Sequence, residues 1–352
     1  MGDQNFTVNG PVTGRQVVFG NDNVLGDSAA STGRERDGSS PGPVFGIVTA
    51  LPEEFAAVRA VLDDAGQPRT VAGDRALYVL GTMPSRDDDR PHEVVLTLLG
   101  DTGNSAAAEA CANLIRSFPS VDTVVMCGIA CGVPNPHRPE RHVRLGDIVV
   151  ATWGIADYDH VVETDDGRRP RQTFPSPSPL LVRLARYLAA VEISGERPWE
   201  KWITEALTSL GAFGRPDDAT DRIYTAEDRT VPHPPPDLSG HHPGFPKVHH
   251  GLIGSADRSL RSARIRDALA ASHQLIAFEM EGKGIGSAGF AGGLEWFVVR
   301  GISDYGDVHT GLRWRGYASV VAAAYARALL AECPPLSPRG GHPHATGGAQ
   351  RA

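Results

Sequence analysis

Short apolar runs alternate with amphipathic stretches along most of the chain. The first run, 44–50 (VFGIVTA), is continuous and apolar, as is typical of a buried strand. It is followed by 52–66 (PEEFAAVRAVLDDAG), in which Phe55, Val58 and Leu62 lie on one face of a predicted helix. This pair of segments is the first of several strand and helix units.

The same alternation continues to the end of the apolar pattern. Further strand-like runs occupy 94–100, 121–133, 146–155, 247–257, 274–282 and 295–307. An alanine-rich helix is predicted at 104–118 and a last helix at 317–330. Strands that alternate with helices predict an α/β layered domain, in which ligands bind beyond the carboxyl ends of the strands.

Three segments depart from this pattern. Residues 1–42 and 334–352 are rich in Gly and polar residues without a sustained period, so we predict a disordered N-terminal arm and a disordered tail. The remaining 43–333 form one folded domain, interrupted by a proline-rich insertion at 165–247 that has one clear helix at 179–192. The two histidines of the tail are interpreted as tail residues.

The charge of the chain limits the classes of partner. Its 352 residues carry 34 Lys and Arg against 42 Asp and Glu, a formal net charge of −8. A broad basic face for nucleic acid or an anionic membrane is therefore not expected, although a local basic pocket for one phosphorylated ligand remains compatible. No stretch approaches the roughly 20 apolar residues of a membrane span, and the N-terminus has no signal-peptide core. These features predict a cytoplasmic protein.

Cysteine and histidine give no metal pattern. The four cysteines fit no disulfide framework, and Cys127 and Cys131 lie in an apolar run that favours buried thiols over a metal site. Five histidines lie close together in or just after the insertion, at 233, 241, 242, 249 and 250. Their spacing matches no standard zinc pattern, and we expect no metal.

Acidic residues follow three of the predicted strands. Glu54 comes after the first strand at a helix start, Glu281 closes FEMEG, and Asp304 lies in RGISDYGD. Each has a structural explanation, since a carboxylate complements a helix N-terminus or caps a turn. Three acids at the carboxyl ends of strands of one sheet nevertheless mark the edge where sites form.

Six motifs, in this order, resemble the nucleoside phosphorylase/nucleosidase superfamily: TALPEEF, GIACG, GDIVV, GLIGSAD, FEMEG and VVRGISDYGD. The resemblance covers 44–333, and the closest well-known member type is the methylthioadenosine/S-adenosylhomocysteine nucleosidase, although the effector domains named next are the nearer model. The insertion and the final segment resemble the nucleosidase-type effector domains of NACHT- or repeat-containing immune proteins. The resemblance to the superfamily implies a three-layer sandwich with a central mixed, twisted sheet flanked by helices. It also implies a homo-oligomer without a cofactor that acts on purine nucleosides or nucleotides, ATP included, as a defence effector.

The resemblance implies three catalytic residues, and the chemistry of the reaction agrees with it. Breaking a ribosyl C–N bond gives the sugar oxocarbenium character while the purine gains electron density. Asp304 would be the general acid at N7, Glu54 would activate water, and Glu281 would hold the ribose hydroxyls.

Further residues are expected to bind the substrate. The glycine turns at Gly100 and Gly128 let backbone approach a ligand, although tight turns need glycine in any case. Around base and ribose the expected residues are Ser259, Leu260, Glu279, Met280 and Ser303, with Ser259 where the methylthioadenosine type has an aromatic residue. For a triphosphate the candidate cations are Arg168, Arg169, Arg171, His309, Arg313 and Arg315.

Two other functions stay open. A purine nucleoside phosphorylase would use phosphate, but the first loop has no arginine before Arg59, and the charge of Glu54 disfavours phosphate, so hydrolysis is favoured. A non-catalytic nucleotide-sensing module would not need the acid–base pair. No repeat array or NTPase motif accompanies the domain, so a sensor would be a separate protein.

Overall fold

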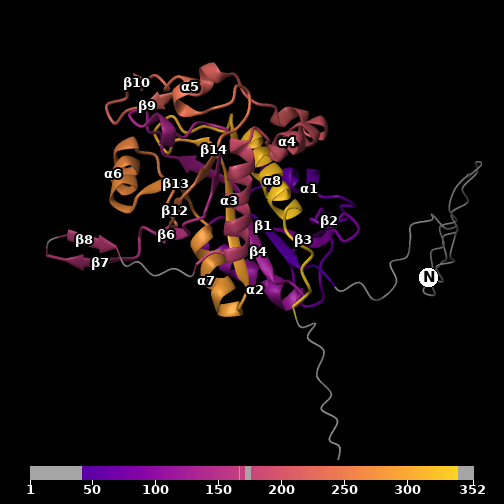
Figure 1. Cartoon of the computed structure of the whole chain (residues 1–352). Helices are drawn as coiled ribbons and strands as arrows, with labels where there is room; N and C mark the ends of the chain where they lie inside the picture. Colours follow the sequence, from indigo (N-terminus) through magenta and orange to yellow (C-terminus); the bar gives the residue numbers. More distant parts are fainter. Residues whose placement is uncertain (1–41, 166, 171–175, 340–352) are drawn as a thin grey trace, which may run out of the picture. The chain divides into compact units, whose positions relative to one another are not determined.

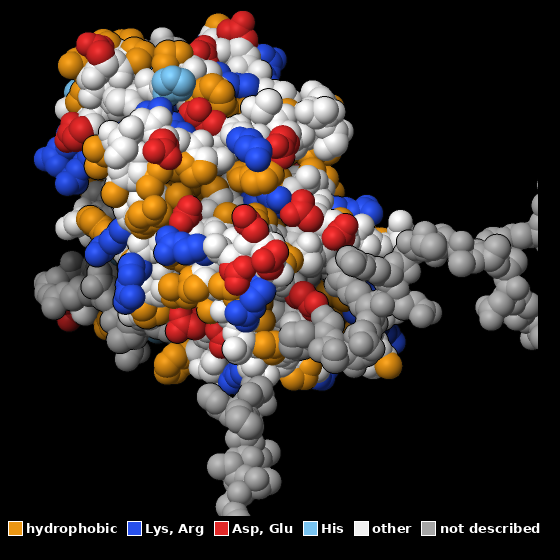
Figure 2. Space-filling model, turned by 45° about the vertical axis from the view of Figure 1, so that its right-hand side comes forward, with side chains coloured by type: hydrophobic (Ala, Val, Ile, Leu, Met, Phe, Trp, Pro, Cys, Tyr) orange, Lys and Arg blue, Asp and Glu red, His pale blue; other side chains and the backbone are white. Residues whose placement is uncertain are grey.

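The computed structural model describes residues 42–165, 167–170 and 176–339, with side chains described outside 166–175 (Figure 1). The predicted N-terminal arm, apart from Gly42, and the tail from residue 340 lie outside this range. Within it, no helix combines the length and apolar character that crossing a bilayer requires. On the face shown in Figure 2, basic and acidic side chains are interspersed.

A ten-stranded mixed sheet forms the centre of the molecule (Figure 1). Its main path has the order β11-β5-β14-β4-β1-β3-β2, and β13, β12 and β6 extend it from β4. Pairing is parallel between β1 and both β3 and β4 and between β4 and β14, and antiparallel between β2 and β3 and between β5 and β14. The strands are β1 Phe45–Thr49, β2 Tyr78–Met83, β3 His92–Leu98, β4 Thr123–Gly132, β5 Ile148–Val150, β6 Ile155–Asp157, β11 Val248–His250, β12 Leu252–Ser255, β13 Leu275–Glu279 and β14 Glu295–Asp304.

Helices cover the sheet. Helix α8 packs against β14 and β4 and against α1 and α4, whereas α2 packs against α7, which also contacts β14. The predicted layered fold, a mixed sheet flanked by helices, is therefore confirmed. The helices are α1 Pro52–Ala60, α2 Asn104–Ser117, α3 Pro179–Ile193, α4 Pro198–Ser209, α5 Pro236–Ser239, α6 Ala263–His273, α7 Gly282–Gly292 and α8 Arg315–Ala331, with short 3-10 turns at Pro139–Arg141, Gly211–Phe213 and Asp218–Thr220.

The first helix and the strand that follows it differ from the sequence prediction. Helix α1 ends at Ala60 and not near Gly66, because 63 and 66 leave the helix to bond to β2. The amide of Asp63 donates to Thr82 O at 2.9 Å and that of Gly66 to Leu80 O at 2.8 Å. Strand β2 was not predicted from the sequence, because its six residues lie between charged segments.

The close packing of α8 on β14 depends on small residues. Every residue of 317–330 is buried, and a Cβ added at Gly301 would overlap the carbonyl of Ala318. Glycine at 301 and the alanines of the helix therefore let the two backbones approach. This contact fixes the end of β14, where Asp304 lies.

The insertion contributes to the core more than its proline content suggested. It contains α3 and also α4, which the sequence analysis did not identify, and both helices bury apolar side chains in the main core. Trp199 of α4 is fully buried beside Tyr325 of α8, with 5.4 Å between ring centroids. The insertion also holds the short ribbon of β9 Ile223–Tyr224 and β10 Thr230–Val231, and another ribbon, β7 Val161–Thr164 with β8 Gly167–Pro170, spans its start.

Candidate active site

One cavity of about 320 Å³ lies where the ends of β1, β4, β13 and β14 meet. Glu54, Glu281 and Asp304, which are far apart in the sequence, all line it. The loop after β12 forms another wall. The structure therefore brings together the three acids that the sequence singled out. The volume of this cavity is at the lower end of the range typical of small-ligand sites.

Glu54 is held by backbone amides at the end of β1. Its Oε2 accepts hydrogen bonds from the amides of Ala50 (2.6 Å) and Leu51 (2.9 Å), and its Oε1 accepts one from Ile129 N of β4 (2.8 Å). Burial raises the pKa of Glu54, opposed by the charge of Arg300 and by these three amides. The carboxylate thus complements the first turn of α1 and also faces the cavity.

Arg300 is the centre of the acidic cluster. It is fully buried, its Nη2 donates to Glu279 and, at 3.1 Å, to Glu281 Oε2, and its Nη1 lies 4.0 Å from Glu54 Oε1. One guanidinium therefore balances three carboxylates away from solvent. The sequence analysis missed this residue. A single arginine inside the apolar strand 296–302 was the signal, because a buried charge needs a partner.

Glu281 and Glu279 form the turn that begins α7. Glu279 Oε2 accepts hydrogen bonds from the amides of Glu281 (3.0 Å) and Gly282 (2.7 Å), and Glu281 Oε1 accepts one from Gly103 N (3.1 Å). Burial raises the pKa of Glu281 to about 7; the charges of Glu279 and Glu54 add to the rise, while Arg300 opposes it. Glu279 therefore shapes the turn, and Glu281 presents a carboxyl group that titrates near neutrality.

Asp304 is the last residue of β14 and lines the same cavity. Its Oδ1 accepts hydrogen bonds from Gly306 N (2.8 Å) and the Thr310 hydroxyl (3.2 Å), and its Oδ2 accepts one from Ser303 Oγ (2.9 Å). Burial raises the pKa of Asp304, and these donors and the charge of Arg315 oppose the rise. A raised pKa is what a carboxylic acid needs to keep its proton for catalysis.

The other expected substrate-binding residues divide between the cavity and its surroundings. Ser259, Leu260, Met280 and Ser303 line the cavity with Glu279. His309 and Arg313 instead line an adjoining cavity of about 440 Å³, which shares Ser303, Asp304 and Thr310 with the first.

Three further candidates lie elsewhere. Gly128 is buried behind the acids, where a Cβ would overlap Glu54 Oε1 and Arg300 Nη1. Gly100 is exposed, has open space around its Cα and does not line the cavity, because the turn it makes faces solvent. The side chains of Arg168, Arg169 and Arg171 lie outside the described residues.

Arginines on the cavity wall come from two elements. Arg258 and Arg261 belong to the loop after β12, and Arg315 begins α8. Arg258 pairs with Asp159 at 2.6 Å and lies over the ring of Tyr158. Of the three, only Arg315 was among the sequence candidates. The other two follow GSAD, a motif that gives no sign of how the loop folds over the site.

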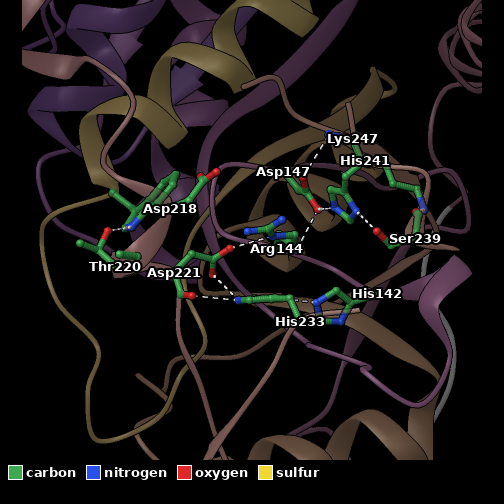
Figure 3. A network of polar contacts seen from close by, with 12 residues as sticks. His142, Arg144, Asp147, Asp218, Thr220, Asp221, His233, Ser239, His241 and Lys247 are labelled. Atoms are coloured by element: carbon green, nitrogen blue, oxygen red, sulfur yellow. Dashed lines mark hydrogen bonds and ion pairs between the residues drawn. The ribbon is translucent and has the colours of Figure 1, made fainter. Parts of the chain in front are cut away.

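Part of the histidine group meets at Asp147, away from the acidic cavity. Asp147 Oδ2 lies 2.8 Å from His241 Nε2 (Figure 3). It also lies 2.9 Å from His249 Nε2 and accepts a hydrogen bond from Arg144 N at 2.8 Å. Among the described residues, the side chains of Asp147, His241 and His249 form the group whose ligand atoms lie close enough together to hold a metal ion. Because an ionised carboxylate only accepts hydrogen bonds, we interpret the cluster as a hydrogen-bonded one in which both imidazoles carry a proton on Nε2.

Comparisons with known proteins agree with this architecture. The family model described as "Phosphorylase superfamily" matches residues 44–331. A nucleotide-binding leucine-rich repeat (NLR)-like protein of Hyaloscypha variabilis is 30% identical over 319 residues, covering 85% of this chain but 30% of the relative. A 5′-methylthioadenosine/S-adenosylhomocysteine nucleosidase of Mycobacterium bovis is 27% identical over 300 residues, covering 83% of this chain and 97% of the relative.

Solved structures show the same fold at lower sequence identity. A Helicobacter pylori 5′-methylthioadenosine/S-adenosylhomocysteine nucleosidase, 16% identical, superposes with a TM-score of 0.56 and covers 83% of this chain and 99% of its own. The family expected from the six motifs is confirmed by the match over 44–331. The chain belongs to the phosphorylase superfamily.

Proposed function

We propose that this protein is a hydrolase that cleaves the N-glycosidic bond of a purine nucleoside or nucleotide. The observation that carries the proposal is the placement of Glu54, Glu281 and Asp304 around one cavity, with Glu54 and Glu281 beside Arg300 and Asp304 outside that ion-pair cluster. The nucleosidases among its relatives support hydrolysis of an N-glycosidic bond.

Asp304 acts as the general acid. Its protonated carboxyl donates to N7 of the purine while the C1′–N9 bond breaks, so that the base leaves as a neutral molecule. The carboxylate left behind is stabilised by Gly306 N, Ser303 Oγ and Thr310 Oγ1, which already point at its two oxygens. Hydrogen bonds to the anion favour this proton transfer, while burial keeps the acid protonated before it.

Glu54 acts as the general base for water. It takes a proton from the water that attacks C1′, and solvent later carries that proton away and returns one to Asp304. The amides of Ala50, Leu51 and Ile129 fix the direction of its carboxylate. Holding the base in place removes an ordering cost from the reaction.

Glu281 binds the ribose hydroxyls. Its carboxylate, oriented by Arg300 Nη2 and Gly103 N, accepts hydrogen bonds that strengthen as the sugar becomes cationic. The positive charge of Arg300 lowers the pKa of Glu281, against the rise caused by burial and by the charges of Glu279 and Glu54. Glu281 can therefore lose its proton and bind the ribose as a carboxylate.

Adenine nucleotides, ATP included, are the substrates we favour. The arginines on the cavity wall support a phosphorylated substrate, since guanidinium groups suit phosphate. The chain spans about 30% of the NLR-like relative, and an effector role in defence is proposed from that likeness. The same arginines suit a phosphate nucleophile, which makes phosphorolysis the second candidate.

Chromatography of base release tests the proposal. ATP, adenosine, methylthioadenosine, inosine and guanosine are each incubated with the protein, with and without phosphate. Phosphate-independent release of free base is expected, and strict dependence on phosphate would show a phosphorylase. Asp304→Asn and Glu54→Gln are each expected to lower kcat by about 100-fold or more. Glu53→Gln is the matched control, because the neighbouring Glu53 does not line the cavity; full activity of Glu54→Gln would contradict the mechanism.

A further inference from the structure

Two segments that are far apart in sequence are tied together beside Asp304. We call 304–314 the acid loop and 218–233, which lies in the insertion, the latch. Tyr305 Oη donates to Asp221 Oδ1 at 2.7 Å, and Trp314 Nε1 donates to Thr220 Oγ1 at 3.1 Å. The latch is thus bonded to both ends of the acid loop.

A largely buried polar network anchors the latch to the body of the protein (Figure 3). Asp221 Oδ2 accepts a hydrogen bond from Arg144 Nε at 2.9 Å. His233 Nε2 lies 2.9 Å from Asp221 O, and its Nδ1 lies 2.9 Å from His142 Nε2. Because Arg144 and His142 precede β5, the latch is held by the frame of the central sheet.

A third tie grips the middle of the acid loop. The ring of His309 stacks on Tyr224, with 3.7 Å between centroids and 23° between planes, and its Nε2 lies 2.5 Å from Asp228 Oδ1. His309 N also donates to Asp307 Oδ1 at 2.9 Å. The His309 side chain, which is 39% exposed, is therefore held by the latch through ring stacking and a partly exposed polar contact, and its backbone is held by the loop itself.

Thr310 comes next in the chain and reaches Asp304. Its hydroxyl lies 3.2 Å from Asp304 Oδ1 and 2.9 Å from Asp307 O. One hydroxyl proton serves only one acceptor at a time. A small displacement of residue 310 therefore decides whether the proton goes to the carboxylate or to the carbonyl.

We propose that His309 is a positioning residue: gripped by Tyr224 and Asp228 of the latch, it holds Thr310 where its hydroxyl can donate to Asp304. Through this contact the insertion adjusts the acid that protonates the leaving base. The inference rests on the proposed role of Asp304 as the general acid.

The consequence for acidity has a definite sign. A hydroxyl that donates to Asp304 stabilises the carboxylate, so releasing the latch raises the pKa of Asp304 further above its ordinary value. The alkaline limb of the pH–rate profile then moves to higher pH, and kcat below it falls by about tenfold, the equivalent of one hydrogen bond to a charged group. The charged and titratable groups that line the two cavities with Asp304 come from every element packed around it. They are Glu54 of α1, Cys131 of β4, Arg258 and Arg261 after β12, Glu279 and Glu281 at the end of β13, Arg222 and Tyr224 of the latch, Tyr305, Asp307, His309 and Arg313 of the acid loop, and Arg315 of α8, with Arg266 of α6 bonded to Tyr305 O.

A double-mutant cycle tests the inference. The pH dependence of base release is measured for His309→Ala, Thr310→Val, the double variant and Tyr224→Phe, which keeps the stacked ring. Both single variants are expected to shift the alkaline limb upward with little change in KM, and the double variant to shift it no further than Thr310→Val alone. Tyr224→Phe should match the unmodified protein. Additive effects, or a His309→Ala variant with lowered thermal stability and an unmoved limb, would overturn the inference.

A second readout separates this inference from the proposed function. The pKa of Asp304 is followed by NMR titration of protein labelled with ¹³C at the aspartate carboxyls, with its resonance assigned by its loss in Asp304→Asn. A rise of that pKa in His309→Ala supports the positioning role even if no substrate releases its base. An unchanged pKa in His309→Ala sinks the inference, and absence of base release from the unmodified protein sinks only the proposed function. A rise in KM confined to nucleotides would instead show that His309 contacts phosphate.

Discussion

Arg300 and Glu281 meet inside the protein, with 3.1 Å between Nη2 and Oε2 and no exposed surface on the arginine side chain. The same guanidinium donates to Glu279 and faces Glu54, so the acids of the ribose side share one cation. Removing Arg300 would leave three buried carboxylates without a counter-charge. An uncompensated buried charge is strongly destabilising.

Arg300→Met is therefore expected to lower the free energy of unfolding by about 3–5 kcal/mol at neutral pH. The loss shrinks as the pH falls, because the carboxylates take up protons. Urea denaturation at several pH values measures it. Arg86→Met is the comparison, since its ion pair with Glu332 is 56% and 29% exposed and contributes at most about 1 kcal/mol. Equal losses in the two variants would contradict the role given to Arg300.

The stability of the protein is expected to depend on the proton of Glu281. The folded protein raises the pKa of this carboxyl from 4.5 to about 7, so between these values the folded state holds a proton that the unfolded state has released. The free energy of unfolding therefore falls as the pH rises through this window, by up to about 1.4 kcal/mol per pH unit. Thermal denaturation from pH 4 to 8 measures the fall. Glu281→Gln should reduce it, and the part that remains is assigned to Glu54 and Asp304, whose pKa values burial also raises. A Glu281→Gln protein with the full pH dependence would assign the effect to another group.

Gly128→Ala is expected to reduce base release by more than about tenfold. The new Cβ would overlap Glu54 Oε1 and Arg300 Nη1, so the general base must move out of position. The measurement is the initial rate of base release, and circular dichroism checks that the variant is folded. Gly211→Ala is the control, because open space surrounds that glycine. Unchanged rates in Gly128→Ala would show that Glu54 does not need its observed orientation.

Arg261→Ala and Arg315→Ala are expected to raise KM for nucleotides by about tenfold or more, and to change KM for uncharged nucleosides little. Both arginines line the cavity, and each charge-assisted bond to phosphate contributes about 1.5–3 kcal/mol. Initial rates with ATP and adenosine, at constant ionic strength, make the comparison. An equal rise in KM for both substrates would show that these arginines shape the site and do not read phosphate.

Local sequence patterns were enough to predict most of the sheet. Predominantly apolar runs such as 44–50 and 296–299 became buried strands, since a strand covered on both faces needs apolar residues along most of its length. Strand β2 and helix α4 were missed because each depends on a distant partner. Tyr78–Met83 pairs with β3, and Trp199 packs against Tyr325.

The sequence by itself determined the layered fold and the three acids at strand ends, because periodicity and the strand-end rule are local features of the chain. Only the tertiary structure showed that Arg300 holds Glu279 and Glu281 together, and that the loop carrying Arg261 folds over the site. Only the tertiary structure showed the latch, in which Asp228 contacts His309 although the two residues are 81 positions apart in the sequence. Such contacts depend on the direction in which packed helices and strands point their side chains. The spacing of apolar residues predicts helices and strands but does not predict that direction.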